Sequence, residues 1–102
     1  MEIKIQSLHF KASDLLEIYV QNKVGKLAQL NDRILSGDVC LKLDKSKKLE
    51  NKVCEIRLAL RGKDLFARRQ SRTFETATNE TVAALQQQIK KRKTQVNKGR
   101  SI

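Results

Sequence analysis

The hydrophobic positions of this chain follow two spacings, and each spacing predicts a different kind of element. In four stretches apolar residues recur at every second position, which is typical of strands that bury one face. The pattern is clearest where Ile56, Leu58 and Leu60 alternate with other residues. The predicted strands span Glu2–Ser7, Ile34–Leu43, Lys52–Arg61 and Asp64–Gln70.

Two longer segments place apolar residues about 3.6 positions apart, as amphipathic helices do. Ser13 and Thr73 precede these segments and are suitable helix caps. Gly25 lies inside the first segment at a cost of about 1 kcal/mol relative to alanine, which close packing against a neighbour would explain. The predicted helices run from Ala12 or Asp14 to Gln29 and from Phe74 to Val96. Their predicted buried stripes are Leu16, Val20, Val24 and Leu27 in the first, and Phe74, Ala77, Thr78, Val82, Leu85 and Ile89 in the second.

The predicted element order is β-α-β-β-β-α, an α+β class in which two helices pack on one face of a four-stranded sheet. A chain of 102 residues forms one domain, which we place at residues 1–95, followed by a short basic C-terminal tail at 96–102. No apolar run approaches the roughly 20 residues that cross a bilayer, and the N-terminus lacks a signal-peptide pattern. These features indicate no membrane partner and favour a cytoplasmic location.

The charge of the chain predicts an anionic partner. It carries 22 basic and 11 acidic residues, a formal net charge of +11 at pH 7, so nucleic acid is the first candidate. The segment from Lys90 to Ile102 holds no carboxylate, and Lys23 and Lys26 lie along one flank of the first predicted helix. Solvated helix surfaces and lysine stems that cover core edges are the alternative explanation. The densest run of cations is Lys90, Lys91, Arg92 and Lys93.

The residues with catalytic chemistry form no group that predicts an active site. His9, the only histidine, lies between a strand and a helix with no evident partner. Cys40 and Cys54 lack metal-ligand spacing and should face opposite sides of the sheet, which predicts two reduced cysteines. The chain has no phosphate-binding glycine loop of the GxxxxGK type. We therefore expect no enzyme, cofactor, metal or small-molecule substrate.

The sequence also narrows the kind of nucleic acid. Its four aromatic residues do not form the paired strand aromatics that stack single-stranded bases, and no zinc finger or zipper is present. Recognition of backbone and shape is therefore favoured, and folded RNA offers a surface dense in phosphates and 2′-hydroxyls. These features predict a small RNA-binding α/β domain.

Three segments, in this order and spacing, carry a resemblance to a known family. They are Val20–Leu27 (VQNKVGKL), then Asn31–Ile34 leading to Val39–Leu43, and Gly62–Ala67 followed by the basic helix that ends in Gln88–Lys93. Over about residues 1 to 95 the chain resembles the bacterial ribosome hibernation-promoting factor family, which includes the ribosome-associated inhibitor A branch. The fold of that family agrees with the order predicted above.

The resemblance implies a function and a set of contact residues. Members of the family bind the small ribosomal subunit and its ribosomal RNA where messenger RNA and transfer RNA would sit, and they block translation in stationary phase or starvation. By matching position, the expected RNA contacts are Lys23, Lys26, Lys90, Lys91, Arg92 and Lys93. Arg33 also matches a family position, although it could instead pair structurally with Asp32.

The resemblance is to the short form of the family, which lacks the added C-terminal domain that pairs two ribosomes. Arg92 stands where many relatives have histidine. Whether the chain promotes ribosome dimers, and whether a helper factor takes part, stays open. Two alternatives also stay open: a general binder of structured RNA or duplexes, and a protein-interaction module that regulates transcription through the open sheet face.

Overall fold

The computed structural model describes residues 1–45 and 48–100, and it describes side chains as far as Lys91. The element order is β-α-β-β-β-α, so the predicted α+β class is confirmed. A short 3-10 helix, η1, directly follows the first α-helix. The elements are β1 (Glu2–Leu8), α1 (Asp14–Gly25), η1 (Lys26–Gln29), β2 (Ile34–Leu43), β3 (Lys52–Leu60), β4 (Lys63–Ser71) and α2 (Phe74–Arg100).

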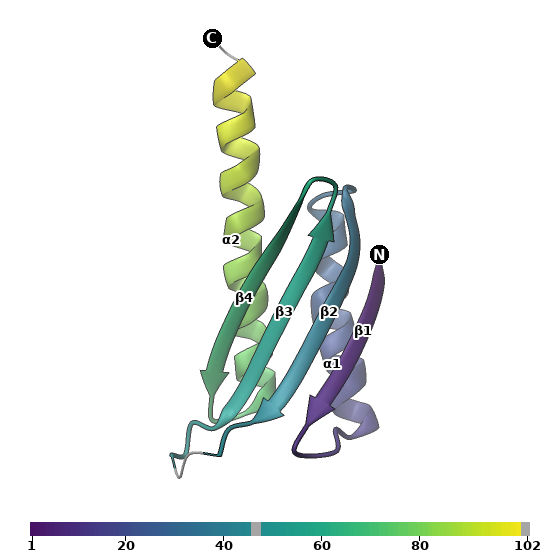
Figure 1. Cartoon of the computed structure of the whole chain (residues 1–102), viewed down its shortest axis with the longest axis vertical. Coiled ribbons are helices and arrows are strands. Elements are labelled where there is room, and N and C mark those ends of the chain that lie inside the picture. The colour runs from purple at the N-terminus through teal and green to yellow at the C-terminus, as the bar shows by residue number, and fades with distance from the viewer. Residues whose placement is uncertain (46–47, 101–102) are drawn as a thin grey trace.

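The four strands form one mixed sheet in the order β1-β2-β3-β4. β1 pairs with β2 in parallel, as expected for a helical crossover, whereas β2–β3 and β3–β4 are antiparallel pairs. Both helices cover the same face of this sheet and leave the other face open (Figure 1). No helix in the described part of the chain is long and apolar enough to cross a lipid bilayer.

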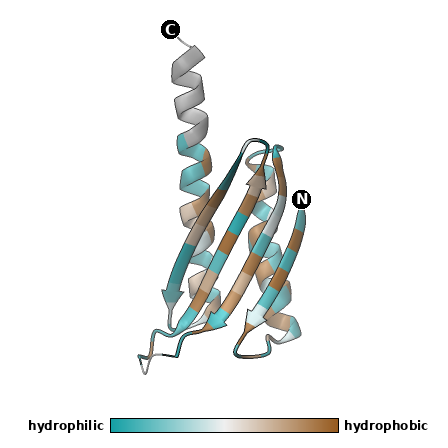
Figure 2. Ribbon diagram, viewed as in Figure 1, coloured by the Kyte–Doolittle hydropathy of each residue, from teal (hydrophilic) through white to brown (hydrophobic). Residues whose placement is uncertain are grey.

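The core lies between the sheet and the two helices. Brown and teal positions alternate along the strands in Figure 2, as the sequence pattern predicts for a sheet with one buried face. Cys54 is fully buried there and Cys40, on the opposite face, is half-buried; both are free thiols, as predicted. The largest fully buried side chains of the core include Leu27, Leu41, Ile56, Leu58 and Leu85.

The first helix begins as predicted but ends earlier. Ser13 caps it, because its hydroxyl oxygen accepts a hydrogen bond from the Leu16 backbone N–H at 3.1 Å. The α-helix ends at Gly25, and the last predicted turn is the tighter helix η1. Close packing does not explain Gly25, because the nearest atom to a Cβ added there would be Ile3 Cδ1 at 4.0 Å.

The second helix is also capped as predicted, by Thr73, whose hydroxyl accepts from the Thr76 backbone N–H at 3.1 Å. It continues to Arg100 rather than ending at Val96. Thr81, which the predicted stripe omitted, is fully buried, and its hydroxyl donates to the Ala77 carbonyl oxygen at 2.7 Å. Bonding to the preceding turn lets this polar side chain occupy a core position.

Candidate RNA-binding surface

The C-terminal ends of α1 and α2 lie at the same end of the molecule because of the sheet topology. β1, β2 and β4 point in one direction, and each helix follows one of these strands and returns antiparallel to it. The two helices therefore run side by side in the same direction, and α2 extends beyond the sheet (Figure 1). A helix C-terminus carries partial negative charge, which favours Lys23 in the last turn of α1.

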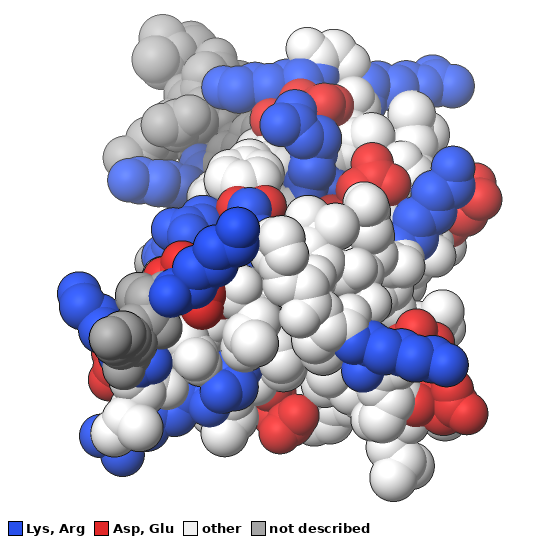
Figure 3. Space-filling model, turned by 60° about the horizontal axis from the view of Figure 1, so that its bottom comes forward, with Lys and Arg blue, Asp and Glu red and all other residues white. Residues whose placement is uncertain are grey.

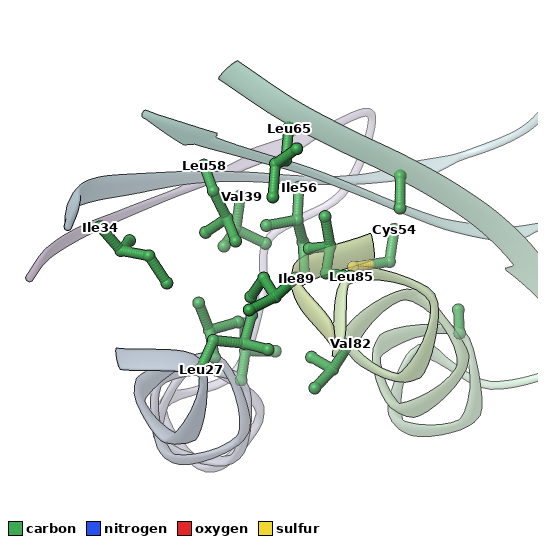
Figure 4. Close-up of a cluster of buried hydrophobic side chains, with 14 of the residues drawn as sticks. Leu27, Ile34, Val39, Cys54, Ile56, Leu58, Leu65, Val82, Leu85 and Ile89 are labelled. Carbon is green, nitrogen blue, oxygen red and sulfur yellow. The ribbon is translucent and has the colours of Figure 1, made fainter. Parts of the chain in front are cut away.

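Packing in the core places one lysine from each of the two helical segments beside the same buried cluster. Leu27 of η1 and Ile89 of α2 belong to one buried cluster and point into the space under the sheet (Figure 4). Their chain neighbours Lys26 and Lys90 are both exposed. Two lysines that the sequence predicted as contacts from separate helices therefore flank the same part of the core.

The other predicted contacts from the first half of the chain lie at this end too. Lys23 is half-buried, with its ammonium nitrogen 5.5 Å from the centre of the Tyr19 ring, a cation–π contact. Arg33 is exposed in the α1–β2 loop, which is shaped by a hydrogen bond of 2.9 Å from its backbone N–H to Asn31 Oδ1. None of the ion pairs in the described part of the chain links Arg33 to Asp32.

The basic run of α2 is only partly described. Lys91 is exposed, as Lys90 is, and both lie in the last part of α2 for which side chains are described. The backbone at Arg92 and Lys93 is helical, but their side chains lie outside the described residues. Their role as contacts stays a prediction from the sequence.

The structure adds two cations that the sequence did not suggest. Arg61 and Lys63 flank Gly62 in the β3–β4 turn, which lies at the same end as the helix C-termini (Figure 1). Gly62 has a φ of 88°, a left-handed conformation that glycine adopts without strain. In the sequence alone, Arg-Gly-Lys is explained by the turn, and nothing there marks its two cations as contacts. We call the whole set the helix-end cluster: Lys23, Lys26, Arg33, Arg61, Lys63, Lys90 and Lys91.

The open sheet face has a different character, because several of its cations are paired. Glu55 Oε2 lies 3.1 Å from Lys42 Nζ and 3.1 Å from Arg68 Nε, so one carboxylate serves two cations. Arg57 lies over Phe66, with its guanidinium carbon 5.7 Å from the ring centre, and Phe66 is 46% exposed. This face therefore has less unpaired positive charge to offer a phosphate than the helix-end cluster.

The thiols and the histidine give no sign of reactive chemistry. Burial raises the pKa of the Cys54 thiol, and burial together with Glu55 raises the pKa of the Cys40 thiol, so both favour the unreactive protonated form. His9 is exposed and has a φ of 69°, a turn conformation. The residues that the structure describes include no group of three or more metal-ligating side chains.

Fold and surface together define a small α+β protein with a basic end built from both helices. The chain belongs to the family described as Sigma 54 modulation protein / S30EA ribosomal protein, whose model matches residues 3–97. This is the ribosome hibernation-promoting factor family, so the resemblance inferred from the sequence is confirmed. It is a family of ribosome-associated proteins that are in general not enzymes.

Solved structures agree with this assignment. The chain is similar to the N-terminal domain of Protein Y from Thermus thermophilus, with 25% identity, a TM-score of 0.77, and coverage of 89% of this chain and 98% of that one. It has the fold of a ribosomal subunit interface protein from Coxiella burnetii, with 18% identity, a TM-score of 0.82, and coverage of 92% and 99%. No curated protein sequence matches the chain.

Proposed function

We propose that this protein binds the small ribosomal subunit in the channel for messenger RNA and transfer RNA, and thereby inhibits translation in stationary phase or under stress. The observation that carries the proposal is the helix-end cluster, in which four separate segments of the chain bring cations to one end of the molecule. Membership of a ribosome-associated family suggests the partner. The site of action is then the cytoplasm.

The proposed mechanism is steric occlusion, without any covalent reaction. The molecule is elongated, with extents of 52 × 25 × 19 Å, and α2 projects beyond the sheet at the basic end (Figure 1). A narrow body of this kind could enter a channel lined with phosphates, where its cations would replace the counterions of the RNA. While it is bound, messenger RNA and transfer RNA would be excluded by volume.

Co-sedimentation with purified small subunits through a sucrose cushion tests the proposal. The wild-type protein should pellet with the subunits, and Lys23→Glu combined with Lys91→Glu should stay in the supernatant. The matched control is Lys4→Glu with Lys11→Glu, which changes the net charge equally at exposed positions near β1, away from the cluster. Unchanged co-sedimentation of the Lys23/Lys91 variant would refute the proposed interface.

Related experiments would distinguish the proposed function from two alternative functions. A general binder of structured RNA would be released from ribosomes by arbitrary duplex RNA at physiological salt, whereas a ribosome-specific protein would not. The exposed ring of Phe66 on the open face favours a protein-interaction module. Such a module would keep its partner after nuclease treatment and would not respond to charge reversal in the helix-end cluster.

A further inference from the structure

The two edge strands of the sheet differ sharply in charge. β1 carries one cation and one carboxylate, Lys4 and Glu2. β4, at the opposite edge, carries Asp64 as its only carboxylate, and Arg57 lies 3.7 Å from that carboxylate and offsets it. The cations in β4 and the residues beside it are Arg61, Lys63, Arg68, Arg69 and Arg72.

Among the residues that the structure describes, Arg68 is the only one of these cations that takes part in an ion pair. Arg68 pairs with Glu55, but that carboxylate is shared with Lys42. Arg69 donates to the Arg68 carbonyl oxygen at 2.7 Å and, with Glu80 of α2, lines a shallow hollow of about 290 Å³ between β4 and that helix. In the described part of the chain no ion pair involves Lys63, Arg69 or Arg72, and all three are exposed.

The β2–β3 loop adds positive charge at the far end of β4. The Gln70 side chain holds this loop against the strand by donating to the Glu50 carbonyl oxygen at 2.6 Å and to Asp44 Oδ2 at 3.2 Å. Lys45 and Lys48 of the loop are exposed. In Figure 3 blue side chains are more abundant on the left, the side of β4 and this loop, than on the right.

We propose that the β4 rim, defined as Lys63, Arg69 and Arg72, is a second RNA-binding surface that holds the phosphate backbone of an RNA helix. This inference rests on the proposed function and adds a contact to it. Lys63 also belongs to the helix-end cluster, so the two surfaces adjoin at the β3–β4 turn. A strand of nine residues is roughly 30 Å long, enough to follow several successive phosphates, and the free backbone N–H groups of an edge strand offer further donors.

Protection of the sheet edge is the competing explanation for these charges. Charged side chains on an edge strand prevent pairing with other chains and so limit aggregation. Either sign of charge serves that purpose, but only positive charge attracts phosphate. Reversing the sign therefore separates the two explanations.

The test compares the affinity for small subunits of three proteins: wild type, Arg69→Glu with Arg72→Glu, and the control Lys4→Glu with Lys11→Glu. The rim variant should fold, because position 69 is exposed and a carboxylate at position 72 lies near the N-terminus of α2, which favours negative charge. Thermal unfolding followed by circular dichroism checks this. A milder pair, Arg69→Gln with Arg72→Gln, removes the positive charge without adding a negative one.

We expect the Arg69→Glu/Arg72→Glu variant to bind on the order of tenfold more weakly or worse, and its logarithmic salt slope to be shallower by about 2, because each lost phosphate contact removes about one unit. The glutamine pair should lie between it and the wild type, and the control should bind like the wild type. A rim variant that binds as tightly as the control would overturn the inference and leave edge protection as the role of these charges. Failure of the wild type to bind would instead refute the proposed function itself, and the rim inference with it.

Discussion

The salt dependence of ribosome binding reports how many phosphates the protein contacts, and the structure sets its expected value. Five members of the helix-end cluster are exposed and take part in none of the ion pairs of the described residues. Two members are set apart: Lys23, because its ammonium lies over the Tyr19 ring, and Lys90, because it takes part in another interaction. The five are Lys26, Arg33, Arg61, Lys63 and Lys91.

The expected magnitude follows from counterion release. Each phosphate contact contributes roughly 0.7 to 0.9 to the slope of log K against log salt, so five contacts give a slope of about −4. Raising salt from about 50 to about 200 mM should then weaken binding roughly 250-fold. If the β4 rim also binds, Arg69 and Arg72 should steepen the slope to between about −5 and −6.

The assay is a titration of N-terminally labelled protein with purified small subunits in increasing KCl. Free Mg²⁺ is held constant, because divalent ions compete for the same phosphates. Lys26→Gln should make the slope shallower by about one unit, and the exposed control Lys11→Gln, near β1, should leave it unchanged. A wild-type slope shallower than about −2, or no response to Lys26→Gln, would refute the electrostatic mechanism.

Two further predictions concern stability. Gly37→Ala should lower the free energy of unfolding by about 1 kcal/mol or more, because the added Cβ would lie 3.3 Å from Leu58 Cδ2. Gly25→Ala should raise it by about 0.5 to 1 kcal/mol, because the backbone there is helical and the added Cβ would only touch Ile3 Cδ1 at 4.0 Å. Urea unfolding of both variants checks this, and the reverse order would contradict it. Burial raises the pKa of the Cys54 thiol above its ordinary value of 9.0, so the unfolded chain releases this proton at a lower pH than the folded chain does. The stabilisation of the fold by the protonated, buried thiol is therefore complete below about pH 9 and is lost as the pH rises further. The difference in unfolding free energy between wild type and Cys54→Ala should therefore narrow between pH 8 and pH 10. A constant difference would show that ionisation of this thiol does not contribute to the pH dependence of stability.

Local patterns predicted most of the fold, because the spacing of apolar residues and the caps of the helices involve residues that are close together in the sequence. Strand alternation identified all four strands to within a residue or so at each end, and Ser13 and Thr73 cap the helices as expected. The errors arose where tertiary contacts decide. Thr81 looks polar in the sequence but is buried against β3, since its hydroxyl is satisfied by the helix backbone.

The candidate surface was less predictable, because it gathers cations from segments that are distant in the sequence. A local concentration of charge marks the start of the basic run at Lys90 and Lys91, but Arg61 and Lys63 stand out only once the β3–β4 turn is placed beside the helix ends. The common direction of the two helices brings these groups together. It follows from the parallel pairing of β1 with β2 and from two successive antiparallel pairs, which return β4 to the direction of β2. Adding or removing one strand between β2 and the last helix would reverse α2 and place its basic end at the opposite end of the sheet, so the strand count determines whether one surface or two can form.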